Sequence, residues 1–188
     1  ESLGENRMLI EFDGAYMNSE VWCNGKFCGV RPYGYSSFCY DITPFVKAGE
    51  PAVLAVRIDN SRHKNSRWYS GSGIYRHVWL TTASPLRVDH WGTYVTTPEV
   101  SGSKAQVSCL TTIVNDRDEA QEFTMISTLL DEAGTEVACE SAQATVQGRG
   151  EKAEVRTMME VENPSLWSPD CPNLHTLRTT VSIGSEIV

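Results

Sequence analysis

Short runs of alternating apolar and polar residues follow one another along this chain. In its first third, such runs cover residues 7–13, 20–23, 26–30, 37–40 and 52–59. A period of two residues is that of a β-strand with one buried face, so each run predicts a strand. Asn24-Gly25 separates two of these runs and is the dipeptide that best tolerates the positive φ angles of a type I′ hairpin turn. The run at 52–59 is rich in strand-forming residues and is expected at the centre of its sheet.

Residues 41–49 interrupt the alternation and predict a single helical turn. Asp41 or Thr43 offers a polar cap, Pro44 stands near the start of the turn, and Gly49 follows it. No helix long enough to stand alone is expected in this part of the chain. The pattern therefore predicts a β-sandwich, built from sheets, a hairpin and loops.

The second half of the chain continues with longer strands. They are expected at residues 86–96, 105–114, 122–130, 136–146, 153–161 and 175–183. Strands of such regular spacing, separated by turn residues, are typical of an immunoglobulin-like sandwich of about 100 residues. Residues 81–85 are small and polar and end in a proline, as expected of a joint between domains. We therefore predict two all-β domains, over residues 1–84 and 85–188.

Charge supports this division and narrows the classes of partner. The chain has 16 basic and 24 acidic residues, a net charge of −8. Residues 1–84 carry 9 basic and 8 acidic side chains, net +1, whereas residues 85–188 carry 7 and 16, net −9. An acidic chain without a basic stripe argues against nucleic-acid binding, because phosphate recognition needs clustered Lys and Arg. No apolar run approaches the ~20 residues that span a bilayer, which argues against a membrane protein.

Six cysteines invite a disulfide or metal interpretation, but their spacing does not favour either. No Cys-x-x-Cys pair occurs, and the four histidines are scattered. Free, mostly buried thiols are therefore predicted, with neither a metal site nor a cofactor. Cys23 and Cys28 flank the hairpin turn and are expected close enough for an accidental disulfide under oxidation. The compartment stays open, with a periplasmic or secreted location preferred.

Residues 58–80 form a long stretch with neither a helical nor a strand period. Long ordered loops in compact all-β domains are usually functional. This one combines flat aromatic faces with directed donors and acceptors, on Trp68, Tyr69, Asp59, Asn60, Arg62, Asn65 and Arg67. Such a mixture suits a sugar better than a nucleotide or a metal. The alternative is that the loop packs against a neighbouring domain, and both roles are compatible.

Two aromatic segments carry an expectation about packing. Gly71 and Gly73 allow the backbone to fold back tightly, so that Ile74 and Tyr75 are expected to return to the core. Trp167 lies between two prolines and is expected to act as a packing plug of the second domain.

A family resemblance lies in the same long loop. Residues 67–76 read Arg-Trp-Tyr-Ser-Gly-Ser-Gly-Ile-Tyr-Arg and, with Val78-Trp79-Leu80 after them, closely resemble the signature of glycoside hydrolase family 2. This family contains β-galactosidases, β-glucuronidases and β-mannosidases. Four upstream segments look like the rest of its N-terminal sugar-binding jelly roll: Phe12-Asp13-Gly14-Ala15-Tyr16, Val21-Trp22-Cys23-Asn24-Gly25, Gly34-Tyr35 and Phe38-Cys39-Tyr40-Asp41-Ile42-Thr43. Residues 163–169, Asn-Pro-Ser-Leu-Trp-Ser-Pro, resemble a segment of its immunoglobulin-like domain.

The resemblance implies a partial galactose-binding-like jelly roll, incomplete at its N-terminus, followed by a nearly complete immunoglobulin-like spacer. In the family, two catalytic glutamates stand on a (β/α)8 barrel after that domain, and such carboxyl groups lie about 5 to 5.5 Å apart in retaining enzymes. Neither glutamate is expected in this chain. We therefore predict a non-catalytic fragment of a β-glycosidase, with β-galactosidase preferred, which is inactive alone. Its expected partners are the carbohydrate substrate, the barrel and, as is common in the family, further copies of itself.

The resemblance also assigns roles within the long loop, which faces the mouth of the active site in the family. The expected substrate contacts are Asp59, Asn60, Arg67 and Trp68, and the expected contacts with the barrel are Arg62, Tyr69, Tyr75 and Arg76. The surrounding cations either favour hydroxyl-rich or anionic substrates or anchor the interface. A stand-alone carbohydrate-binding module and a purely structural sandwich remain alternatives. The sugar itself stays undecided, because its choice depends largely on barrel residues.

Overall fold

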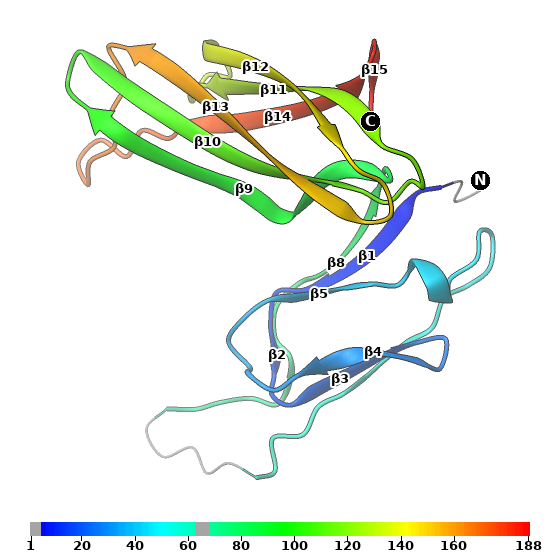
Figure 1. Cartoon of the computed structure of the whole chain (residues 1–188). Helices are drawn as coiled ribbons and strands as arrows, with labels where there is room; N and C mark the ends of the chain where they lie inside the picture. Colours follow the sequence, from blue (N-terminus) through cyan, green and yellow to red (C-terminus); the bar gives the residue numbers. More distant parts are fainter. Residues whose placement is uncertain (1–4, 63–67) are drawn as a thin grey trace. The chain divides into compact units, whose positions relative to one another are not determined.

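The computed structural model describes residues 5–62 and 68–188, and nearly all its regular structure is β-strand (Figure 1). The chain divides into two compact units, Glu1–Ser84 and Pro85–Val188. Fifteen strands and one 3₁₀ turn make up the regular structure of the described residues. The all-β fold class predicted from the alternation is therefore confirmed. A membrane-spanning helix is not found within the described ranges.

Two three-stranded sheets and a short ribbon form the first unit. In one sheet, β1 (Arg7–Phe12) lies between β5 (Phe38–Asp41) and β8 (Val78–Ala83). In the other, β3 (Ser19–Cys23) lies between β4 (Lys26–Arg31) and β6 (Leu54–Arg57). The ribbon pairs β2 (Ala15–Tyr16) with β7 (Gly73–Ile74), and all of these pairings are antiparallel. The five strands predicted in this part of the chain are present as β1, β3, β4, β5 and β6.

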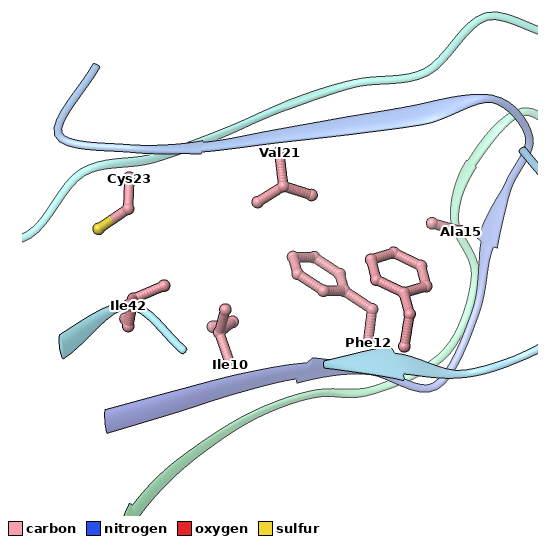
Figure 2. Packing of buried hydrophobic residues seen from close by; sticks show 7 residues of the cluster. Ile10, Phe12, Ala15, Val21, Cys23 and Ile42 are labelled. Carbon is pink, nitrogen blue, oxygen red and sulfur yellow. The ribbon is translucent and has the colours of Figure 1, made fainter. Parts of the chain in front are cut away.

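The hydrophobic core of this unit lies between its two sheets. Ile10 and Phe12 of β1 and Val21 and Cys23 of β3 all point into it (Figure 2). Phe12 stacks on Phe38 with the ring centroids 4.9 Å apart. Along β3, buried residues alternate with half-buried ones, because successive side chains of a strand point to opposite faces. The alternation in the sequence therefore marks the face that packs into the core.

The predicted hairpin and helical turn are both present. Asn24 and Gly25 join β3 to β4 with φ angles of 47° and 75°, as a type I′ turn requires. The helical turn is the 3₁₀ element η1 (Thr43–Phe45). The side-chain amide of Asn24 donates to the carbonyl oxygen of Phe45 at 2.8 Å, and this bond ties the hairpin to η1.

One expectation about this unit is wrong. The run at 52–59 forms β6, which lies at the edge of its sheet and, among the described strands, pairs with β3 alone. β8 is the corresponding edge of the other sheet. Leu80 on β8 is 59% exposed, although its register partner is the buried Ile10. A high content of strand-forming residues does not show whether a strand is central or at an edge, because the order of strands depends on non-local pairing.

The second unit contains two larger antiparallel sheets. The first has the order β13-β10-β9, with β9 (Leu86–Val100), β10 (Lys104–Asn115) and β13 (Glu151–Glu162). The second has the order β12-β11-β14-β15, with β11 (Gln121–Leu130), β12 (Glu136–Val146), β14 (Thr176–Ile183) and β15 (Glu186–Ile187). All six predicted strands are present, and β15 is an additional short one. Two sheets that share a core agree with the predicted immunoglobulin-like sandwich.

The core of the second unit is mostly apolar and includes a buried pair of hydroxyl groups. Phe123 and Met125 of β11 pack in the same cluster as Val155 of β13, so side chains from both sheets meet there. Ser127 follows Met125 by two residues, and Thr157 follows Val155 by two. The buried hydroxyl of Thr157 donates to the hydroxyl oxygen of Ser127 at 2.9 Å. This hydrogen bond joins the two sheets inside the core.

The cysteines are free, but only some are buried. Cys23 and Cys109 are buried, Cys28 and Cys39 are half-buried, and Cys139 and Cys171 are exposed. The expectation of mostly buried thiols therefore holds for the first two only, since a cysteine on an outer face or in a loop has no core to enter. Burial, with Glu11 and Asp41 nearby, raises the pKa of Cys39 to about 11, so this thiol is protonated at neutral pH. Within the described ranges, no group of three His, Cys, Asp or Glu residues is placed to hold a metal ion.

Candidate functional site

Residues 58–77, called the long loop below, stand between β6 and β8, and their described part includes β7. The first arm of the long loop is fixed to the segment between β2 and β3. The backbone N–H of Asp59 donates to the carbonyl oxygen of Met17 at 3.1 Å. In return, the side-chain amide of Asn18 donates to the carbonyl oxygen of Asp59 at 2.9 Å. Asn18 has a φ of 48°, a conformation that asparagine tolerates better than most residues. The loop therefore starts from a defined position.

Asp59 is held in its ionised form. Its carboxylate accepts hydrogen bonds from the hydroxyl of Ser61 at 2.6 Å and from the Ser61 N–H at 3.0 Å. These bonds, with smaller contributions from the Arg62 and Arg57 guanidiniums, lower the pKa of the Asp59 carboxyl. The Arg57 guanidinium lies 3.7 Å from the Asp59 carboxylate and 3.3 Å from the Glu20 carboxylate, so it is shared between the two. Asp59 is therefore suited to accept hydrogen bonds and not to donate a proton.

Asn60 links the two arms of the long loop. Its side-chain N–H donates to the hydroxyl oxygen of Ser72 at 3.1 Å. Its side-chain oxygen is buried and has no hydrogen-bond partner among the residues that the structure describes. A buried acceptor without a partner is uncommon in folded proteins and marks a position where function or bound water is expected.

The returning arm presents aromatic residues to solvent. Trp68 is 62% exposed, and its indole N–H donates to the hydroxyl oxygen of Tyr35 at 3.1 Å. Tyr69 is fully exposed. The chain then pairs as β7 with β2 before it reaches β8.

Ile74 and Tyr75 do not enter the core, contrary to the expectation from Gly71 and Gly73. Both are more than two-fifths exposed. Tyr75 instead packs on Gly14, where any Cβ would overlap its ring, and its hydroxyl donates to the carbonyl oxygen of Gly34 at 2.8 Å. The two-residue pairing of β7 with β2 holds this segment on the outside of the sandwich.

A pocket of about 240 Å³ lies beside the returning arm. We call it the tyrosine pocket, and it is lined by Tyr16, Tyr35, Tyr69, Ser70, Gly71, Ser72 and Tyr75. The rings of Tyr16 and Tyr35 are tilted with their centroids 5.0 Å apart. Tyr16 packs directly on Gly34, where a side chain would collide with its ring. The pocket therefore joins three segments that are distant in sequence.

The residues singled out from the sequence fall into three groups. Asp59, Asn60 and Trp68 belong to the hydrogen-bonded framework of the long loop. Arg62, Tyr69, Tyr75 and Arg76 are exposed, as an interface with another domain requires. Arg67 lies outside the described residues.

Sequence reasoning missed Tyr16 and Tyr35 as members of a site. Both stand in segments that resemble the family, Phe12-Asp13-Gly14-Ala15-Tyr16 and Gly34-Tyr35, and that was the available signal. Nothing in the order of residues shows that these segments meet, because 18 positions separate the two tyrosines.

In the second unit, Trp167 is 60% exposed and is not a packing plug. It forms an isolated antiparallel bridge with Pro172, which turns the segment back on itself. Asn173 supports this turn, since its side-chain amide donates to the carbonyl oxygen of Leu166 at 3.0 Å. The bridge holds the indole at the rim of an apolar groove of about 560 Å³ instead of inside the core.

Comparison with known proteins matches both parts of the chain. Residues 1–84 match the family model described as glycosyl hydrolases family 2, sugar binding domain, and residues 87–188 match glycosyl hydrolases family 2. β-Galactosidase BoGH2A of Bacteroides ovatus is 50% identical over 94% of this chain, which covers 21% of that protein. A β-glucuronidase of Formosa agariphila is 27% identical over 97% of this chain and 20% of its own length.

Solved structures agree with these matches. The crystal structure of a glycosyl hydrolase family 2 member from Bacteroides cellulosilyticus superposes with a TM-score of 0.94 at 34% identity, covering 99% of this chain and 25% of that protein. This chain thus spans about a fifth of the length of the curated relatives. Its two domains together show that the chain belongs to glycosyl hydrolase family 2, as the sugar-binding domain and the immunoglobulin-like domain of that family.

Proposed function

We propose that this chain is the non-catalytic N-terminal part of a β-galactosidase, which shapes one wall of the substrate cleft and supports the catalytic barrel. The observation that carries the choice of sugar is the 50% identity with a β-galactosidase over 94% of the chain. Relatives named for β-glucuronidase activity share 35% identity or less. At such lower identities, relatives named β-galactosidase occur as well, so these matches do not discriminate between the two sugars.

The chemistry of the long loop supports a binding role over a catalytic one. Glycoside hydrolysis uses two carboxyl groups across the scissile bond, one of which must hold a proton. Asp59 is the only acidic residue between Ile58 and Leu80. Its pKa is lowered by Ser61 and the neighbouring arginines, which is the wrong direction for a general acid. Asp59 therefore fits a hydrogen-bond acceptor for sugar hydroxyls.

The test is an assay of the whole protein and of the isolated 188-residue chain. We expect the whole protein to hydrolyse a chromogenic β-galactoside faster than the matching β-glucuronide, and the isolated chain to hydrolyse neither. Faster glucuronide turnover by the whole protein would reassign the sugar. Turnover by the isolated chain, lost on substitution within it, would overturn the non-catalytic role.

A carbohydrate-binding module is the second candidate, and the tyrosine pocket favours it. A concave site with aromatic walls and a few polar groups is the usual form of a small-ligand site. Sugar binding by a whole protein that hydrolyses neither glycoside would favour the module.

A further inference from the structure

We propose that the tyrosine pocket binds one neutral pyranose ring, an inference that takes from the proposed function only that the ligand is a sugar. The pocket measures about 240 Å³. Pockets for drug-sized ligands span about 300 to 1,000 Å³, so this one has room for a single ring and not for an oligosaccharide.

The aromatic walls suit the apolar faces of a sugar ring. Tyr16 and Tyr35 are tilted by 58°, so their rings do not stack on each other as a closed pair. Tyr69 is fully exposed, and a Cβ at Gly71 would meet open space. Tyrosine supplies a large flat surface at a small cost in side-chain freedom, and this is why it is common in recognition sites.

Two hydroxyl groups of the pocket keep a proton to donate. The Tyr35 oxygen accepts from the Trp68 indole N–H at 3.1 Å, and the Ser72 oxygen accepts from the Asn60 amide at 3.1 Å. Each hydroxyl is both a donor and an acceptor, and accepting one bond strengthens it as a donor. The two donors come from separate segments and are available to the hydroxyl oxygens of a sugar.

The pocket is formed without a ligand. Tyr75 is anchored through its hydroxyl to the carbonyl oxygen of Gly34, and Tyr16 packs on the same glycine. Tyr16 is also paired with Gly73 through β2 and β7. Because these contacts already order the rings, binding loses less conformational freedom than a flexible loop would.

The lining favours an uncharged sugar. Among the residues that the structure describes, seven line the pocket; each is a tyrosine, a serine or a glycine, and none of these side chains is charged at neutral pH. Asn60, which bonds to Ser72, is preceded in the chain by the ionised Asp59, which has the same charge as a uronic acid. A uronic acid would bring a carboxylate to a site whose described lining residues supply no counter-charge, and it would lose hydration without compensation from them.

The test is an NMR titration of the 188-residue chain with methyl β-D-galactopyranoside. We expect saturable amide shifts at Gly34, Gly71 and Ser72, with a millimolar Kd. The anionic glycoside methyl β-D-galactopyranosiduronate differs only at C6. It is expected to bind at least about tenfold more weakly, since its carboxylate must be desolvated. The absence of saturable shifts with the neutral sugar, or equal binding of the anionic one, would overturn the proposal.

Matched variants locate the binding site. Gly71→Leu adds a bulky side chain to a lining residue of the pocket and is expected to abolish the shifts, whereas Gly102→Leu, at another glycine with open space around it, is expected to leave them unchanged. Tyr35→Phe keeps the ring, removes the donor and is expected to raise Kd about threefold to tenfold, the effect of one neutral hydrogen bond. Dispersed amide spectra of all three variants check folding. Binding retained by a folded Gly71→Leu chain would place the sugar elsewhere.

The two proposals fail separately. Hydrolysis of β-galactosides by the whole protein, together with no pocket binding in the titration of the 188-residue chain, would contradict only the pocket. Conversely, pocket binding in a protein without glycosidase activity would contradict the proposed function and leave the pocket as a sugar site.

Discussion

Single residues of the long loop owe their properties to immediate neighbours. Ser61 follows Asp59 by two positions and donates to it through both its N–H and its hydroxyl. This is the local turn that Asp commonly forms with the backbone two residues later. The low pKa of Asp59 is therefore set, in the folded loop, by residues no more than three positions away.

At this scale we predict the pH response of Asp59. Because its folded-state pKa is lowered, the carboxylate contributes stability above the ordinary value of about 3.9, and this contribution is lost as the pH falls through the folded-state pKa. An NMR titration of the carboxyl carbon should give a midpoint below that value. The difference in unfolding free energy between the parent chain and Asp59→Asn should shrink on acidification.

Ser61→Ala supplies the internal check for Asp59. It removes the hydroxyl donor and should move the Asp59 midpoint upward, whereas Ser103→Ala in the second unit should not. An unchanged midpoint in Ser61→Ala would show that Ser61 does not set the pKa.

Among the strands of the second unit, β11 and β13 are joined across the core by a buried polar contact. β11 and β13 belong to different sheets, and most of the residues between them are apolar. Ser127 and Thr157 are both buried and bond to each other. A buried hydroxyl that loses its partner costs more than the bond itself contributed.

We therefore predict non-additive effects for this pair. Thr157→Val should lower the unfolding free energy by about 1 to 3 kcal/mol, because the Ser127 hydroxyl is left without its partner. The double variant Thr157→Val with Ser127→Ala should recover part of that loss. Urea denaturation of the single and double variants measures the coupling, and strictly additive effects would contradict it.

Elements with local causes were predictable, and those with distant causes were not. The hairpin at Asn24 and Gly25 follows from two adjacent residues that accept positive φ, and it is present. The edge position of β6 was not foreseen, because alternation identifies a buried face and says nothing about which strands lie on either side. Similarly, Trp167 is apolar enough for a core but is held outside by its bridge with Pro172.

For the whole molecule, the edge strands of the first unit carry apolar residues on the same sheet face as the core. These residues are nevertheless exposed to solvent. Leu80 and Val78 are paired with the buried Ile10 and Phe12, yet they are 59% and 40% exposed. Leu54 on β6 is also exposed, opposite the buried Cys23. Apolar strand edges of this kind are sites of association.

We predict that the isolated chain associates through these edges. Leu80→Lys should lower the association constant at least about tenfold, since burying one leucine contributes about 1.5 to 3 kcal/mol and an edge lysine opposes pairing. Leu174→Lys is the matched control, because Leu174 is similarly exposed, at 67%, but lies outside the strands. Sedimentation velocity over a concentration series gives the constants, and equal effects of the two substitutions would contradict the edge model.

The strands, the turns and the family can be read from the amino-acid sequence alone. Each depends on residues close together in the chain: a period of two, a dipeptide, or a run such as residues 67–76. Three features are visible only in the folded chain: which strands are edges, which aromatic residues are exposed, and the convergence of Tyr16, Tyr35 and Tyr75 on one pocket. These features arise from pairing between distant segments, such as β2 with β7, and alternation along a chain holds no information about the partner of a strand.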